Sequence, residues 1–153
     1  MAGIEIHGTD EKFLDVTLND VLPCLHPPAC IQWRLWLLEA WSAKEWSMEG
    51  LSCEAYENVV NKAPGGYPIT REQIQHLADA PTQLVNMVLL GSADFATVPP
   101  EAFEQRANLY TACDYVIDFF DSSYVIVYSW DEAFMTCLRQ RLKGVKDDSA
   151  VTP

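Results

Sequence analysis

The sequence lacks the short motifs that mark common enzyme families. It contains no G-x-x-x-x-G-K-[ST] phosphate loop, no G-x-G-x-x-G turn, no G-x-S-x-G elbow and no H-E-x-x-H helix. Its three histidines, His7, His26 and His76, do not stand at metal-ligand spacing from another strong ligand. These absences favour a non-catalytic protein, and we expect neither a cofactor nor a metal ion.

Cysteine is present but shows no pattern. The five cysteines are an odd number, are widely spaced and form no C-x-x-C pair. They stand at Cys24, Cys30, Cys53, Cys113 and Cys137. This spacing predicts neither a disulfide framework nor a zinc site, and we interpret the five side chains as buried free thiols.

Long hydrophobic runs are also absent. No apolar run approaches the roughly 18 residues that a membrane span needs, and Met1 to Thr9 lacks the order of a signal peptide. We therefore predict a soluble, cytoplasmic protein. A chain of 153 residues, 49% of them apolar, suits one domain that buries roughly two thirds of its unfolded surface. We place this domain at residues 1–144 and predict that the polar tail, 145–153, is frayed.

Basic residues are scarce relative to acidic ones. The chain has 22 acidic and 10 basic residues, a net charge of −12. Up to Leu138 there are 20 acidic and 6 basic residues, which gives this part a net charge of −14. Nucleic acids and anionic membranes need a cationic surface, so we expect no nucleic-acid partner and no membrane. A cationic protein partner fits this charge, although negative charge can also serve solubility alone.

Three segments carry the clearest strand patterns. Residues 115–120 and 124–128 are rich in β-branched and aromatic residues and are separated by Asp121-Ser122-Ser123, which predicts two paired strands. Leu84 to Leu90 is apolar on both parities, which predicts a central strand covered on both faces. A short edge strand is predicted where Ile4 to His7 alternates.

Residues 31–40 are more ambiguous. Ile31, Trp33, Leu35, Leu37 and Glu39 share one parity, which favours a strand with that face inward. The spacing also leaves a helix open.

Helix boundaries are well marked. Ser52 can cap a helix that runs through Lys62, and Thr70-Arg71-Glu72-Gln73 has capping-box spacing before a helix to about residue 79. Ser129 and Glu132 have the same spacing before a helix that we expect to end at Gly144. The elements predict one α+β domain with a mixed or antiparallel sheet of about four to five strands and helices packed mainly on one face.

Two regions supply candidate partner-binding residues. Trp41 and Trp46 bracket a polar loop, where they either cover the rim of the core or contact a partner. Asp118 lies within an apolar strand near Asp121, and we favour an outward, solvated Asp118 over an inward one that needs donors. The predicted partner-binding residues are Glu39, Trp41, Glu45, Trp46, Asp94, Asp118 and Asp121.

The segment F-D-S-S-Y-V-I-V-Y-S-W-D at 120–131, followed by a helix over Leu138 to Leu142, resembles a recurrent ending of small bacterial proteins. Segments 31–40 and 66–70 are similar to earlier parts of such proteins. Some of them resemble immunity proteins paired with secreted polymorphic toxins, so the resemblance implies an inhibitor role. Val125 departs from it, because an aromatic residue often stands there, and no binding residue is carried across.

The leading hypothesis is a cytoplasmic immunity protein that binds a cationic toxin, for example a nuclease, and neutralises it without catalysis. One alternative is an acidic nucleic-acid mimic from a phage or mobile element that blocks a defence protein. It would carry its acids at phosphate-like spacing on one face. Another is a small hydrolase or transferase with carboxylates or a Cys/His pair assembled by the fold. It would need a pocket with at least two perturbed titratable groups.

Overall fold

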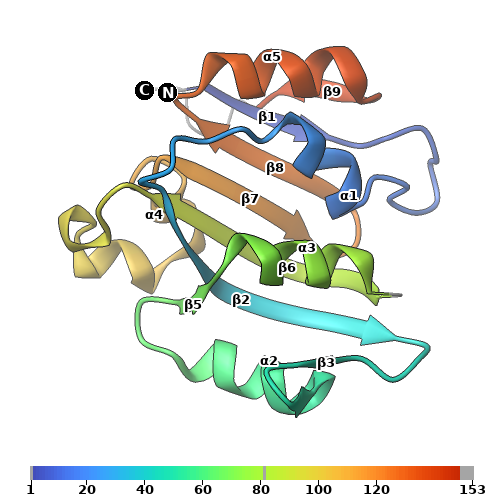
Figure 1. The fold of residues 1–153 in the computed structure, drawn as a ribbon. Helices are drawn as coiled ribbons and strands as arrows, with labels where there is room; N and C mark the ends of the chain where they lie inside the picture. The colour runs from blue at the N-terminus through green and yellow to red at the C-terminus, as the bar shows by residue number, and fades with distance from the viewer. Residues whose placement is uncertain (1, 81, 149–153) are drawn as a thin grey trace.

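The computed structural model describes residues 2–80 and 82–148, which form a seven-stranded antiparallel sheet in the order β5-β2-β6-β7-β8-β1-β9 and a two-stranded β3-β4 sheet (Figure 1). The strands are β1 Ala2–Ile6, β2 Gln32–Ser42, β3 Ser47–Met48, β4 Leu51–Ser52, β5 Tyr67–Ile69, β6 Thr82–Ser92, β7 Tyr115–Phe120, β8 Tyr124–Ser129 and β9 Val145–Asp147. The helical segments are α1 Leu18–Val21, η1 Leu22–Cys24, α2 Cys53–Lys62, α3 Arg71–Asp79, η2 Phe95–Thr97, η3 Pro100–Glu104, α4 Arg106–Leu109 and α5 Glu132–Arg141.

The predicted α+β class is confirmed, and the sheet is larger than predicted. The predicted hairpin is β7 and β8, and the predicted central strand is β6, which pairs with β2 on one side and β7 on the other. The additional strands β5 and β9 are three residues long, which is too short for a period-two pattern to stand out. Strand β1 is no edge strand, because it lies between β8 and β9.

Side chains on the two faces of the sheet form separate cores. The helical face packs against α1, α2, α3 and α5, whereas the second face packs against η2, η3 and α4. Strand β7 shows the alternation, because Ile117 and Phe119 belong to the first core and Val116 belongs to the second. In Figure 1, α4 lies at one end of the strands, and the loop between β1 and α1 lies at the other.

Strand β2 changes face part of the way along its length. Trp33 and Leu35 are buried on the helical face, as predicted. The β2–β6 register then shifts between Leu35 and Leu37, so that Leu38 takes the next inward position and Leu37 packs on the second face. The predicted inward parity is therefore wrong for Leu37 and Glu39, because a bulge reverses the alternation that a regular strand would keep.

The free edge of β2 is covered by side chains of α2. The Asn61 side chain accepts a hydrogen bond from the Leu38 N–H at 2.9 Å and donates one to the Leu38 carbonyl at 2.8 Å. Glu57 accepts a further bond from the Ala40 N–H at 2.6 Å. These two side chains take the place of a neighbouring strand and leave less of the edge open to pairing with another chain.

Local signals placed most helix starts correctly. Ser52 caps α2, and Thr70 with Gln73 forms the predicted capping box of α3. The start of α5 differs, because Asp131 accepts the capping bond from the Phe134 N–H at 3.0 Å. Ser129 is instead the last residue of β8, and its hydroxyl donates to the Asp114 carbonyl at 2.9 Å and accepts from the Asp131 N–H at 3.0 Å.

Two predictions about the chain ends and cysteines are corrected. Cys24 and Cys137 form a disulfide between η1 and α5, and among the remaining cysteines Cys113 is buried whereas Cys30 is exposed. Strand β9 pairs with β1 inside the segment predicted as a frayed tail, and residues 149–153 of that tail lie outside the described residues. Within the described part of the chain, no helix has the length and apolar character needed to cross a membrane.

Candidate functional site

Asp118 is a fully buried acid in β7. Its carboxylate accepts hydrogen bonds from Arg106 Nε at 2.8 Å and from the Tyr110 hydroxyl at 2.6 Å, and it also forms an ion pair with Arg106 Nη2. The prediction of an outward Asp118 is therefore wrong, because the second face supplies the donors that a buried carboxylate needs. Burial is the largest single influence on Arg106 and lowers its pKa, but the hydrogen bond to Asp118 and the charge of Asp118 together outweigh it, so that the pKa of Arg106 is raised.

A row of side chains crosses the sheet beside this buried pair. Glu39 of β2 pairs with Asn86 of β6, and the β6–β7 register, extended by one residue, sets Asn86 beside Phe120. Phe120 pairs in turn with Tyr124 of β8. The ring of His7, which follows β1, lies 5.3 Å from the Tyr124 ring between centroids. Side chains from five neighbouring strands therefore meet in one line on the second face.

Four planar groups of this region stack on one another. The guanidinium carbon of Arg106 lies 4.6 Å from the Phe120 ring centroid, and the Phe120 and Tyr124 rings lie 5.2 Å apart at 13° between planes. The ring of His7 continues the series at 31° to Tyr124, and its Nε2 lies 3.0 Å from a carboxylate oxygen of Glu5. We call Arg106, Phe120, Tyr124 and His7 the planar stack.

Asn86 connects the row to the tip of the β7–β8 hairpin. Its amide nitrogen donates to Glu39 Oε2 at 2.9 Å, and its oxygen accepts from the Asp121 N–H at 3.0 Å and from Arg106 Nη1 at 3.3 Å. Two predicted acids, Glu39 and Asp121, therefore share one neighbour. The predicted Asp118 lies behind the same arginine.

The hairpin tip is a tight turn that holds Asp121 at the surface. Asp121 and Ser122 both have positive φ, 49° and 54°, and the Ser123 N–H donates to the Phe120 carbonyl at 2.9 Å. Positive φ at both central residues is a feature shared with type I′ turns, and the three residues 121–123 join the last strand pair, Phe120 and Tyr124. The side chain of Asp121 is exposed at this tip, next to Phe120 of the row.

The two predicted tryptophans have different environments. Trp41 is 61% exposed. The β2–β6 register shifts again between Glu39 and Ala40, but Leu38 and Ala40 both pack on the first core, which leaves Glu39 and Trp41 on the second face. Trp46 is only 8% exposed and packs in the first core, where its ring stacks on His76. The structure therefore leaves Trp41 available to a partner and assigns Trp46 to the core.

The remaining predicted acids lie away from the row. Glu45 is exposed in the loop after β2. Asp94 follows β6 at the end of that strand opposite the hairpin tip, and its carboxylate accepts from the Ala96 N–H at 2.9 Å as the cap of η2. Neither Glu45 nor Asp94 is a member of the row that contains Glu39.

The candidate surface contains residues that the sequence did not single out. We define the open sheet face as Glu5, His7, Glu39, Trp41, Phe120 and Tyr124. Only two of these, Glu39 and Trp41, were predicted. The alternation with Ile4 and Ile6 carried a usable signal, because it places Glu5 and His7 on the opposite face from those buried residues.

One cavity and two of the free thiols have surroundings that can be compared with those of catalytic groups. A cavity of about 460 Å³ beside α1 and α3 is lined by residues such as Leu14, Leu77 and Phe119, and none of its lining side chains is ionisable. Burial raises the pKa of Cys113 to about 12 and also raises the pKa of Cys53, which disfavours a reactive thiolate. Among residues 2–80 and 82–148, no three His, Cys, Asp or Glu side chains gather as metal ligands would.

Comparisons of the chain with protein-family models, with curated proteins and with solved structures found no match. The function therefore has to be inferred from the charge and the surface described above.

Proposed function

We propose that the protein is a non-catalytic binding protein that neutralises a cationic protein partner, and that this partner is a toxin, as the sequence resemblance implies. The observation that carries the proposal is the charge of the chain up to Leu138, where 20 acidic residues stand against 6 basic ones. Opposite charge accelerates encounter with a basic partner and makes the complex sensitive to salt.

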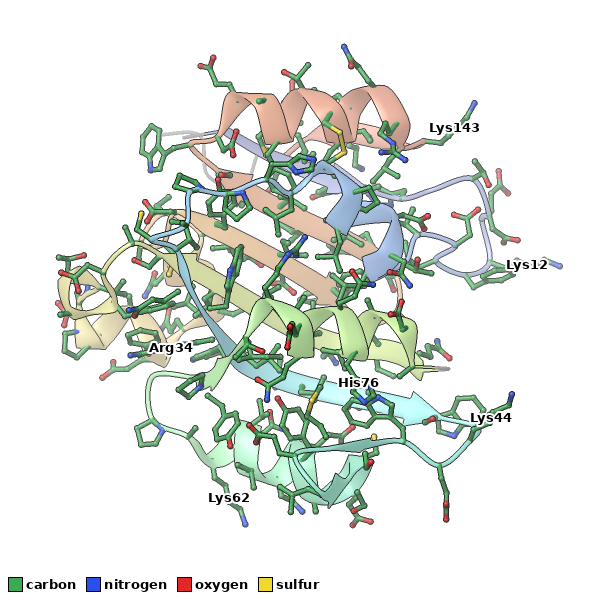
Figure 2. The ribbon with its side chains drawn as sticks, viewed as in Figure 1. Lys12, Arg34, Lys44, Lys62, His76 and Lys143 are labelled. Carbon is green, nitrogen blue, oxygen red and sulfur yellow. A yellow bond between two sulfur atoms is a disulfide. The ribbon has the colours of Figure 1, made fainter. Side chains whose placement is uncertain are left out.

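The positions of the basic residues support this proposal. Arg106, Arg139 and Lys146 each form an ion pair with a carboxylate of the same chain. Figure 2 shows Lys12, Lys44, Lys62 and Lys143 pointing outward from separate parts of the molecule. These lysines do not gather into the cationic patch that nucleic acid requires.

The two alternatives have less support. A nucleic-acid mimic needs its acids along one face, but exposed acids stand on helices of both faces, with Glu54 and Glu72 on α2 and α3 and Glu101 and Glu104 on η3. A hydrolase needs ionisable groups in a pocket, and the lining of the cavity beside α1 has none. A larger, open hollow of about 810 Å³ is lined by Lys44, Glu45, Cys53 and Glu54, but the raised pKa of Cys53 disfavours a nucleophilic thiolate there.

The test is coexpression with the product of the neighbouring reading frame. We expect the two proteins to copurify, this protein to suppress any toxicity of the neighbour, and the affinity to fall as salt is raised. A neighbour that neither copurifies nor is detoxified would overturn the proposal.

A further inference from the structure

We propose that the open sheet face is the docking surface for the cationic partner and that it recognises an arginine-bearing segment of that partner. This inference rests on the proposed function, since a partner without a basic surface would leave the face unused. The inference is based on the aromatic side chains and carboxylates that lie close together on this face.

The aromatic part of the face lies at the edge of the second core. Tyr124 packs against that core but remains half-buried, and Phe120 beside it is also half-buried. Burial and then the charge of Glu5 raise the pKa of Tyr124, so its hydroxyl stays protonated and can donate. Trp41 adds an indole with 61% of its surface exposed. Tryptophan and tyrosine are the residues that most often dominate the energy of protein interfaces.

The protein already holds one arginine in the way that we propose for the partner. The guanidinium of Arg106 lies over the ring of Phe120 and pairs with the carboxylate of Asp118. Trp41 and Glu39 present the same two groups, an aromatic ring and a carboxylate, on the same face of β2. A guanidinium can stack on a ring and bond to a carboxylate through its flat fork, whereas a lysine ammonium acts only as a point charge.

The other exposed tryptophan, Trp130, is not part of the open sheet face. Trp130 is 65% exposed and follows β8. The carboxylate next to it, Asp131, already accepts from the Phe134 N–H at 3.0 Å and from the Tyr115 hydroxyl at 2.5 Å. Trp130 is therefore the control for Trp41, because its exposure is similar but it is not part of the open sheet face and the carboxylate of its neighbour Asp131 is engaged in capping bonds.

The first experiment compares matched variants against the copurified partner of the proposed function. We expect Trp41→Ala to weaken binding about tenfold or more, the usual effect of removing an interface hot spot. Glu39→Gln should weaken binding more than Glu45→Gln, which removes one charge outside the face. Trp130→Ala should leave affinity within about twofold, and thermal melting checks that all four variants fold. Equal affinities for Trp41→Ala and Trp130→Ala would overturn the docking surface and leave the proposed function standing.

The second experiment does not depend on the natural partner. Peptides of ten arginines and of ten lysines are titrated into the isotope-labelled protein, and the nuclear magnetic resonance shifts are mapped. We expect the largest shifts at the Trp41 indole N–H and at the amides of Glu39 and Tyr124. The arginine peptide should bind about two- to fivefold tighter, as expected for a gain of about 0.5–1 kcal/mol from stacking.

Each outcome of the titration is decisive. Shifts centred on Glu101 and Glu104, or equal binding of the two peptides, would overturn the inference. If the shifts map to the open sheet face but the product of the neighbouring reading frame does not copurify, the arginine site is supported and the proposed function is rejected.

Discussion

The helical face of the sheet is covered along its strands by α1, α2, α3 and α5. The cover of the second face, residues 93–114, leaves Glu39 exposed and the rest of the row, up to His7, half-buried. On the helical face, apolar packing and the Cys24–Cys137 disulfide hold the layers together. On the second face, the border of the core is a buried ion pair, Asp118 with Arg106.

Asp118 and Asp121 stand three residues apart in the sequence but differ in burial. Asp118 is buried, and its two donors satisfy it, so it supports the planar stack from beneath. Asp121 is exposed at the hairpin tip. Its bond to Asn86 comes from the backbone N–H and not from the carboxylate. One acid therefore contributes to stability, and the other is available for binding.

The largest expected effect comes from removing the buried carboxylate. Asp118→Ala leaves Arg106 without its counter-charge and the Tyr110 hydroxyl without its acceptor, so we expect a loss of about 3–5 kcal/mol in the free energy of unfolding. Denaturant unfolding measures this loss. Asp121→Ala is the control and should change stability by no more than about 0.5 kcal/mol. Equal midpoints for the two variants would remove the distinction drawn between these acids.

Removing the Cys24–Cys137 disulfide on the helical face should have the next largest effect on stability. Replacing Cys24 and Cys137 together by alanine should lower the free energy of unfolding by about 2–4 kcal/mol, because the unfolded chain loses a cross-link over 113 residues. Cys30→Ala is the control, since Cys30 is free and exposed. A melting temperature that is unaffected by reductant would contradict the prediction.

The disulfide also bears on where the protein acts. Disulfides persist mainly in oxidising compartments, whereas the predicted location is the cytoplasm. Alkylation of thiols in freshly lysed cells, followed by mass spectrometry, shows which state of Cys24 and Cys137 is present. The cytoplasmic location stays a prediction until that measurement.

A smaller effect is expected at the edge of the sheet. Asn61→Ala leaves the N–H and the carbonyl of Leu38 without their partners, which should destabilise the fold by about 1–3 kcal/mol. The uncovered edge should also favour self-association, which sedimentation at rising concentration detects. Asn58→Ala, an exposed change on the same helix, should do neither. A monomeric, fully stable Asn61→Ala protein would show that α2 does not protect the edge.

The smallest expected effect concerns a thiol of the second core. Burial raises the pKa of Cys113 from 9.0 to about 12, so its stabilising contribution is complete below pH 9 and is lost as the pH rises from about 9 towards 12. At pH 8 we expect an alkylating reagent to modify Cys30 and to spare Cys113, as mass spectrometry can show. Equal modification of both thiols in the folded protein would mean that the second core opens readily.

Local patterns were enough to predict several elements of this fold. The Asp121-Ser122-Ser123 break between two β-rich runs predicted the hairpin, and the apolar run from Leu84 to Leu90 predicted the central strand. The caps Ser52 and Thr70 predicted two helix starts. Each of these signals lies within a few residues of the structure that it specifies, so one sequence is sufficient to recognise it.

The candidate surface was only partly predictable. Glu39 and Trp41 were found because acids and tryptophans are common in interfaces for basic partners. Arg106 was missed, since its segment has no pattern that reveals a side chain directed at β7. The inward direction of Asp118 was also missed, because it depends on donors that come from a different element.

The sequence by itself determined the α+β class, the central hairpin and strand, most helix starts and the strong negative charge. Only the tertiary structure decided that a bulge turns Leu37 to the second face, that Cys24 meets Cys137, and that Asp118 is buried while Asp121 is exposed. The physical reason is the distance along the chain over which each interaction acts. Caps, turns and periodicity act between neighbours in the chain, whereas these later choices depend on contacts between residues up to 113 positions apart.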